Sequence, residues 1–243
     1  MCHPDERRTL RVEHMGRVAY GPMLALQEQR HEQVVAGTSD DTLFLLEHEP
    51  VITLGRSSGA DHVLVAPEAL RARGVELFHT GRGGDVTYHG PGQVVGYPVI
   101  LLMEPERDIK RYVTCLEEIM IRSCADFGVA ATRVEGLRGI WVGNNKIGAV
   151  GVRIAAWATL HGFALNVAPE VPGFELIVPC GIRGRGVTSL GHECGHEPTF
   201  ADVVARLSFH AAVVLDRRTI DRTPTPLPNY VPTEPGARSE VLL

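Results

Sequence analysis

The sequence predicts an α+β fold in which helices flank a mixed, largely antiparallel sheet. Segments of strand composition follow one another with few helices between them, whereas a doubly wound parallel sheet requires strands and helices to alternate. The turn sequence Gly143-Asn144-Asn145 separates two apolar runs and predicts a β-hairpin. With 243 residues, 44% of them hydrophobic and 22% charged, the chain is long enough to bury one sizeable core.

Each expected element follows from a local pattern. Pro22 opens a helix through Val35, because proline is favoured in the first helical turn. Residues 108–127 carry apolar side chains on one helical face and charged ones on the other. Thr199 and Asp202 predict the capped start of another helix. The expected strands are short apolar runs, which cover residues 42–46, 51–54, 93–102, 140–142, 146–152 and 158–167.

Composition suggests three parts of unequal size. Residues 1–15 are expected to form a loose N-terminal segment, and residues 16–220 a single domain. The last 23 residues, 221–243, contain five prolines and little periodicity, which predicts an extended or disordered tail.

Charge and cysteine content exclude several classes of function. The net charge of -5 and pI near 6.1 argue against a nucleic-acid-binding protein, which usually has a basic excess. The N-terminus lacks the apolar core of a signal peptide, and the most apolar stretch, Val94–Met103, is too short to cross a bilayer. Five irregularly spaced cysteines do not resemble a disulfide framework. We therefore expect a reduced, cytoplasmic protein that binds neither nucleic acid nor membrane.

Cys180 is the most informative single residue. It follows Pro179 and precedes three glycines within six positions, a setting in which packing cysteines are rarely found. Arg183 and Arg185 lie close in sequence and would favour the thiolate over the thiol. This pattern predicts a nucleophile on a loop, suited to acyl or thioester chemistry.

A cysteine nucleophile needs a base or a cation to activate it. The histidine candidates are His89, His161, His192 and His196. Lys146 is the alternative: on a regular strand it shares a face with Val150, Val152 and Ile154, where its ammonium would be partly desolvated. The ordinary interpretation of Lys146 is an exposed lysine at a hairpin end.

Two other segments have competing interpretations. Residues 81–92 contain five glycines around Arg82, Tyr88 and His89, which favours a ligand-binding loop over a series of turns. They do not match the phosphate-binding P-loop pattern. Residues 192–196, with Cys180, could supply cysteine and histidine ligands to zinc, but matched ligand pairs are missing, so we expect a polar surface loop and no metal site. No G-x-S-x-G motif is present to indicate a serine hydrolase.

Four separated segments resemble the lipoyl(octanoyl) transferase family. The most specific is the run Arg-Gly-Gly-Asp-Val-Thr-Tyr-His-Gly-Pro-Gly-Gln that begins at Arg82. The other three are Leu46–Arg56, Lys146–Ile154, and His161–Asn166 followed by Val178–Ile182. The resemblance covers about residues 40–215, in the same order along the chain.

The resemblance implies a fold, a reaction and a site. The fold would be that of the catalytic domain of biotin and lipoate protein ligases. The enzyme would be an acyltransferase that takes an octanoyl group from octanoyl-acyl carrier protein onto a cysteine and passes it to a lysine. The acceptor lysine would belong to lipoyl domains of 2-oxoacid dehydrogenase complexes or to the glycine-cleavage H protein. No cofactor is implied, since transfer from thioester to amide is downhill.

On this basis Cys180 would be the nucleophile and Lys146 its activating partner, as base or as stabilising cation. The remaining positions that match the family's site would bind substrate. They are Arg82, Gly83, Gly84, Asp85, Val86, Thr87, Tyr88, His89, Ala149, Val150, Gly151, Gly162, Phe163 and Ala164.

Two other functions compete with octanoyl transfer. An ATP-dependent lipoate or biotin ligase of the same fold would need a nucleotide site but no acyl-cysteine. A module that only binds lipoyl domains or acyl carriers would have no use for Cys180 and Lys146. The presence of both residues favours the transferase.

Overall fold

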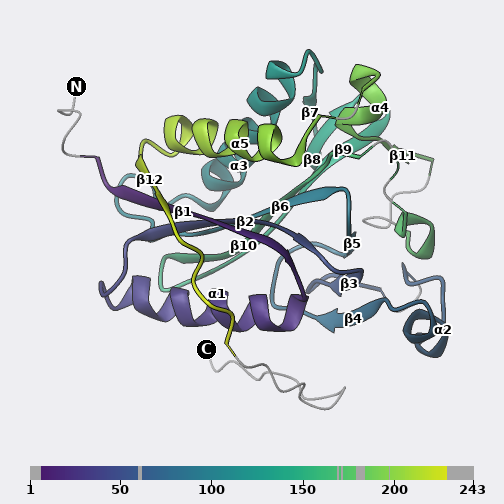
Figure 1. Ribbon diagram of the computed structural model, residues 1–243, viewed down its shortest axis with the longest axis horizontal. Coiled ribbons are helices and arrows are strands. Elements are labelled where there is room, and N and C mark those ends of the chain that lie inside the picture. Colours follow the sequence, from purple (N-terminus) through teal and green to yellow (C-terminus); the bar gives the residue numbers. More distant parts are fainter. Residues whose placement is uncertain are drawn as a thin grey trace.

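A single large sheet, covered by helices on both faces, forms the centre of the molecule (Figure 1). The computed structural model describes residues 7–59, 62–168, 170, 172–178, 184–196 and 198–228. Across these ranges the large sheet has nine strands. In spatial order the main path is β12 (Arg218–Arg222), β1 (Thr9–Val18), β2 (Asp41–His48), β6 (Gln93–Val99), β10 (Ala158–Asn166), β9 (Asn145–Ala155), β8 (Leu137–Val142) and β7 (Thr132–Val134).

The sheet is mixed but mainly antiparallel. Strand β1 runs parallel to both β12 and β2, whereas each pairing from β2 through β6, β10, β9 and β8 to β7 is antiparallel. The ninth strand, β11 (Gly186–Val187), pairs in parallel with the start of β9. The α+β prediction with a mixed, largely antiparallel sheet is therefore confirmed.

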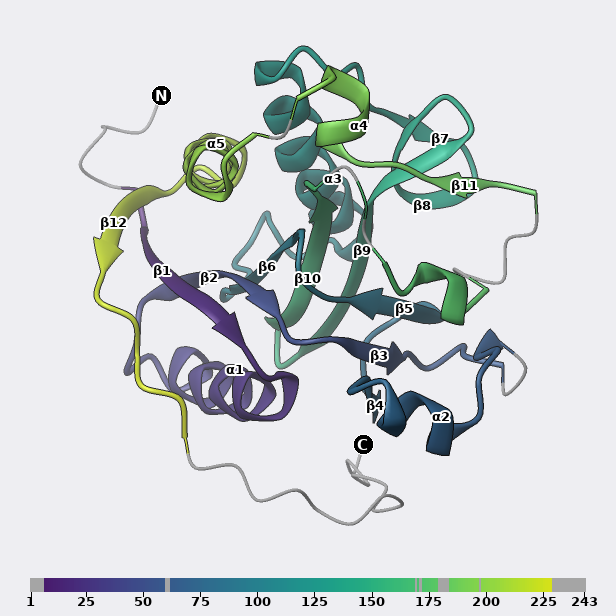
Figure 2. The ribbon, with the colours of Figure 1, turned by 45° about the vertical axis from the view of Figure 1, so that its right-hand side comes forward.

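Two hydrophobic layers enclose the sheet. Helices α3 (Ile109–Asp126) and α5 (Phe200–Val214) cover one face, and α1 (Tyr20–Val35) covers the other (Figure 2). Leu43 and Leu45 of β2 contribute to the first layer, while the alternate residues Phe44 and Leu46 contribute to the second. Because both faces are covered, this strand is a continuous apolar run rather than an alternating one.

A second, three-stranded sheet extends from one side of the large one (Figure 1). It consists of β4 (Glu76–His79), β3 (Val51–Leu54) and β5 (Val86–His89), with α2 (Pro67–Ala72) beside it. Its own small core includes Ile52, Val86 and Tyr88. Two short connections join this sheet to the large one: Glu49-Pro50 between β2 and β3, and residues 90–92 between β5 and β6.

The long helices and central strands lie where the sequence predicts them. Helix α1 begins two residues before Pro22, and Asp108 caps α3 by accepting hydrogen bonds from the N–H groups of Lys110 and Arg111. Thr199 caps α5 through the N–H of Asp202, as expected. The predicted hairpin forms β8 and β9. The short elements β4, β7, β11 and α2 were not expected, because segments of two to six residues carry little periodic signal.

Three expectations about flanking segments are wrong. Residues 9–15, expected in a loose N-terminal segment, form most of β1, and Asp221 and Arg222, expected in the tail, complete β12. Beyond β12, the N–H of Thr225 donates to Glu13 Oε2, so residues 223–228 are held against the domain. The polar loop expected over residues 192–196 instead contributes to α4 (Leu190–Cys194), capped by Ser189.

Within the described ranges, no helix combines the length and apolarity needed to span a membrane.

Strand β1, which lies between the edge strand β12 and β2, is tied to α1 by a buried ion pair. Glu13 on β1 is fully buried, and its Oε1 accepts from Arg30 Nη1 on α1 at 3.3 Å. Arg30 is only 5% exposed, and it also donates to Thr42 on β2 and to Thr225. Removing Arg30 would leave the buried Glu13 with only the longer contact to the partly exposed Arg11, whose Nη2 lies 3.7 Å from the same oxygen.

We expect Arg30→Met to lower the free energy of unfolding by about 3 kcal/mol, because the buried Glu13 would lose its buried cation and keep only the longer contact with Arg11. The measurement is equilibrium denaturation in urea. Arg71→Ala is the matched control, since its pair with Glu68 is exposed on both sides and should contribute about 1 kcal/mol or less. Equal losses in the two variants would contradict this account of the Glu13–Arg30 pair.

Candidate active site

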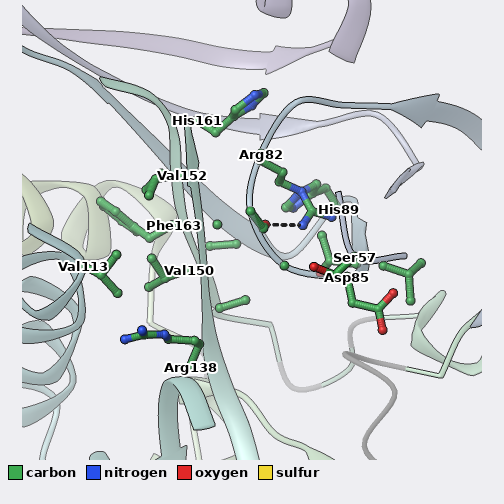
Figure 3. A pocket seen from close by; sticks show the side chains of 18 of the residues that line it. Ser57, Arg82, Asp85, His89, Val113, Arg138, Val150, Val152, His161 and Phe163 are labelled. Atoms are coloured by element: carbon green, nitrogen blue, oxygen red, sulfur yellow. Dashed lines mark hydrogen bonds between the residues drawn. The ribbon is translucent and has the colours of Figure 1, made fainter. Parts of the chain in front are cut away.

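A cavity of about 580 Å³ lies between the glycine-rich segment 82–89, the middle of β9 and β10, and the start of α3. Its two sides differ in chemistry (Figure 3). Val113, Val150, Val152 and Phe163 form an apolar wall on one side, and polar groups that include Arg82 face them from the other. A cavity of this size with one apolar wall and a few convergent polar groups suits a small, mostly apolar ligand.

The cavity brings together residues that are far apart in sequence. Lys146 and all but one of the described residues expected to bind substrate line it. These are Arg82, Gly83, Gly84, Asp85, Val86, Thr87, His89, Ala149, Val150, Gly151, Gly162, Phe163 and Ala164. Tyr88 does not line it: the side chain alternates to the other face of β5 and packs in the small core, with its ring 5.8 Å from that of Phe174. The prediction for Tyr88 is corrected accordingly.

The glycine-rich segment forms the cavity wall because β9 has an uncovered edge. Strand β8 pairs with β9 only as far as Gly148, and β9 continues to Ala155. Beyond that point the N–H of Gly83 donates to Val152 O at 2.8 Å. A Cβ on Gly151 would lie 3.1 Å from Arg82 Cδ and 3.2 Å from Gly83 O, so the lack of a side chain there permits the close approach.

Arg82 is a buried cation at the polar wall, with 7% of its surface exposed. Its Nη2 donates to the backbone and hydroxyl oxygens of Thr53 at 2.7 and 2.9 Å, and its Nη1 donates to Gly83 O at 3.1 Å. These bonds fix the guanidinium plane. The expected ligand-binding loop is therefore a rigid segment, held on one side by β3 and on the other by β9.

Three buried histidines surround this cation. His48 donates from Nδ1 to Val18 O at 3.0 Å, so its Nε2 accepts from the hydroxyl of Tyr97 at 2.8 Å. Burial lowers the pKa of His48 to about 4. Burial, with the nearby His48 and Arg82, lowers the pKa of His89 to about 3, and burial with Arg82 and Arg153 does the same for His161. All three are neutral at pH 7.

His161 is a cavity residue that the substrate-binding prediction omitted. It lies on β10 immediately before Gly162, with a left-handed φ of 60° that is unfavourable for a side chain of this kind. Its N–H donates to Oε1 of the buried Gln27 on α1 at 3.0 Å. Backbone strain of this kind is concentrated at functional sites. Two signals in the sequence point to it: it is a histidine candidate for activating Cys180, and it begins the family-like run His161–Asn166.

The substrate-binding prediction also omitted other cavity residues. Most of them lie on elements that no sequence motif connects with the predicted site. They are Tyr20, Ser57, Tyr97, Ile109, Val113, Gly136, Leu137, Arg138 and Val152. Ile109 belongs to the apolar face predicted for residues 108–127, but it is 53% exposed and lines the cavity. Val113 lines the cavity one helical turn further along.

Lys146 is buried beside an aromatic ring. It is 9% exposed, so the interpretation as an ordinary exposed lysine is wrong. Trp141 lies directly opposite on β8, and Lys146 Nζ is 4.9 Å from the centroid of its ring. Arg185 approaches the same ring, with Cζ also 4.9 Å from the centroid. Trp141 therefore holds two cations at this end of the cavity.

Cys180 lies outside the described residues, as do its neighbours 179 and 181–183. The chain on either side is anchored near the site. The N–H of Val178 donates to His62 O at 2.9 Å, and His62 Nδ1 lies 2.7 Å from Oδ2 of the cavity residue Asp85. On the other side, Val187 of β11 pairs with Lys146.

Comparison with known proteins agrees with this geometry. Residues 19–212 match the family model described as the lipoyl protein ligase A/B catalytic domain. An octanoyltransferase of Chloroflexus aggregans is 46% identical over 217 residues, which cover 88% of this chain and 98% of the relative. One from Caldicellulosiruptor saccharolyticus is 46% identical over 201 residues, covering 82% and 86%.

Solved structures share the fold at low sequence identity. Lipoate-protein ligase A bound with ATP superposes with a TM-score of 0.73 at 18% identity, covering 88% of this chain and 89% of that one. The bipartite lipoate protein ligase of Thermoplasma acidophilum gives 0.67 at 17%, covering 90% and 88%. Biotin protein ligase from Aquifex aeolicus gives 0.54 at 13%, covering 85% and 70%. The expected biotin and lipoate ligase architecture is confirmed.

The buried histidines predict a loss of stability in acid. Their folded pKa values of about 3 to 4 lie below the ordinary value of 6.5, so the unfolded chain binds protons first as pH falls. The free energy of unfolding should therefore fall from about pH 6.5 towards pH 3, with each histidine adding up to about 1.4 kcal/mol per pH unit to the slope. Histidine NMR titration should show these three rings neutral at pH 5. Titration of all three near pH 6.5 would contradict the burial argument.

Proposed function

The chain belongs to the lipoyl protein ligase A/B catalytic-domain family, and within it to the octanoyltransferases, and on that premise we propose a two-step acyl transfer through Cys180. The donor is octanoyl-acyl carrier protein. The acceptor is a specific lysine of a lipoyl domain, in 2-oxoacid dehydrogenase complexes or in the glycine-cleavage H protein. The reaction takes place in the cytoplasm and completes the octanoylation step of protein lipoylation.

The observation that carries this proposal is the position of Lys146 on the cavity. The only two lysines of the chain are Lys110 and Lys146, and Lys110 is exposed on α3 whereas Lys146 is buried against Trp141. The apolar wall formed by Val113, Val150 and Phe163 suits the hydrocarbon chain. Burying the six methylenes of an octanoyl group contributes roughly 5 kcal/mol at ~0.8 kcal/mol each.

In the first step, the sulfur of Cys180 attacks the thioester carbonyl of the donor. The bond from the carbonyl carbon to the carrier's sulfur breaks, and the carrier leaves as a thiol after taking up a proton. Lys146 assists in one of two ways: as a neutral amine it accepts the proton of Cys180, and as an ammonium it stabilises the thiolate.

In the second step, the neutral amine of the acceptor lysine attacks the acyl-cysteine. An amide bond forms, the bond to Cys180 breaks, and the proton lost by the amine returns to the cysteine sulfur. Lys146 is positioned to carry that proton. Because a thioester is converted to an amide, no ATP is consumed.

Incubation with octanoyl-acyl carrier protein without ATP should add one octanoyl group to the protein, detected by intact mass. The adduct should be lost in Cys180→Ala and retained in Cys115→Ala, because burial raises the pKa of the Cys115 thiol and makes it a poor nucleophile. Apo lipoyl domain should then remove the adduct. Acyl transfer that occurs only with ATP would instead identify a ligase.

Lys146→Ala should slow single-turnover acylation by about 100-fold or more, the usual contribution of a proton-transfer group. Lys110→Ala is the matched control and should acylate at the wild-type rate. Circular dichroism checks that both variants are folded. An unchanged rate in folded Lys146→Ala would remove this residue from the mechanism.

A further inference from the structure

A chain of buried polar side chains connects the cavity wall to the strands that hold Lys146. His89 Nδ1 lies 2.6 Å from Gln93 Oε1, and Gln93 Nε2 donates to Asn166 Oδ1 at 2.9 Å. Asn166 Nδ2 donates to Thr188 O at 2.9 Å, and the N–H of Thr188 donates to Lys146 O, also at 2.9 Å. None of the four side chains before Lys146 is more than 8% exposed.

Two backbone carbonyls set the direction of every bond in this chain. Thr188 O can only accept, so Asn166 must present its NH₂ group there and its oxygen to Gln93. Gln93 presents its NH₂ group to Asn166 and to the carbonyl oxygen of Tyr88, 3.4 Å away, and its oxygen to His89. His89 must carry its proton on Nδ1, which leaves the lone pair of Nε2 as an acceptor at the cavity wall.

The two ends of the chain belong to different parts of the site. His89 ends β5 of the small sheet and lines the cavity, whereas Thr188 directly follows β11, whose Val187 pairs with Lys146. Gln93 and Asn166 are direct partners in the register of β6 and β10, so the central sheet provides the middle of the connection.

We propose that Gln93 and Asn166 are a pair of positioning residues: Gln93 sets the tautomer of His89, and Asn166, oriented by Thr188 O, fixes the strand pair of Lys146 relative to the cavity wall. This inference rests on the proposed function, because Lys146 is the group whose position would matter for acyl transfer. Neither Asn166 nor Gln93 lines the cavity, so both act through their neighbours.

Isosteric substitutions break the chain without changing its volume. In Asn166→Asp the carboxylate still accepts from Gln93, but it cannot donate to Thr188 O and places a lone pair against it. In Gln93→Glu the carboxylate still accepts from His89, but it cannot donate to Asn166. Each change places two hydrogen-bond acceptors against each other at one link, which is costly in a buried chain of hydrogen bonds.

The test combines single-turnover octanoylation with two readouts that do not depend on activity. We expect Asn166→Asp and Gln93→Glu to be acylated at least about tenfold more slowly than wild type at saturating donor. The donor concentration that gives the half-maximal rate should change less than about threefold. In Gln93→Leu, which leaves Nδ1 of His89 without its acceptor, ¹⁵N NMR should show a mixed His89 tautomer. In Asn166→Asp, the amides of residues 186–189 should exchange faster.

Thr159→Val is the matched control for simple loss of stability. Thr159 is also a buried residue of β10, and its hydroxyl also bridges to the β6 side of the sheet by donating to Pro98 O, but it does not line the cavity. It should lower the melting temperature yet acylate within about twofold of wild type. If Thr159→Val slows acylation as much as Asn166→Asp does at the same melting temperature, the slowing reflects loss of stability alone. That result would overturn the proposal.

Failure of the proposed function can be distinguished from failure of this inference. If wild-type protein forms no octanoyl adduct, the proposed function fails, and the His89 tautomer and the exchange of residues 186–189 still report on the connection. If the His89 tautomer is unchanged in folded Gln93→Leu and the exchange of residues 186–189 is unchanged in folded Asn166→Asp, the positioning role is wrong whatever the activity.

Discussion

The register of β10 between β6 and β9 is the constraint on which the rest of the structure depends. All nine residues of β10 are buried, and the strand pairs antiparallel on both sides. The register is set by packing: a Cβ on Gly96 would lie 2.2 Å from the ring of Phe163, and a Cβ on Gly162 would lie 2.2 Å from Gly96 O. Only glycine is compatible with either contact. A slip of one residue would move each side chain of β10 to the opposite face of the sheet.

This register places each residue of β10 that bears on the site. Gly162, Phe163 and Ala164 face the cavity region beside β9, and His161 lies at one end of them. Asn166 lies at the other end, opposite Gln93, where it connects the cavity wall to the strands around Lys146. The cavity, the buried histidines and the lysine therefore share one rigid frame.

The uncovered edge of β9 explains why the cavity forms where it does. Strand β8 ends its pairing at Gly148, and the glycine-rich segment takes its place with a single backbone bond to Val152. A continuous β8 would have filled the edge with backbone hydrogen bonds and excluded a ligand. Two sheets meet here, because the segment belongs to the small sheet through β5 and contacts the large one through Gly83.

Much of the fold could be predicted from local patterns. The amphipathic face of residues 108–127, the turn at Gly143-Asn144-Asn145 and the apolar run of β2 each identified an element correctly. Strands β1 and β12 were missed because their stability comes from neighbours. Glu13, a charged residue in the middle of β1, is fully buried only because Arg30 reaches it from α1. A sequence pattern does not contain that partner.

The sequence by itself determined which residue types are available for chemistry: a glycine-rich segment around Arg82, a lysine after a tight turn, and a cysteine in a stretch rich in proline and glycine. Those features depend on residue type and short-range order, which a sequence records directly. Only the tertiary structure decided that Lys146 is buried against Trp141, that Tyr88 faces away from the cavity, and that His161 and Val113 face into it. The physical reason is that burial and side-chain direction are set by strand register and by contacts between distant segments, such as the hydrogen bond from His161 to Gln27, 134 residues away in the sequence.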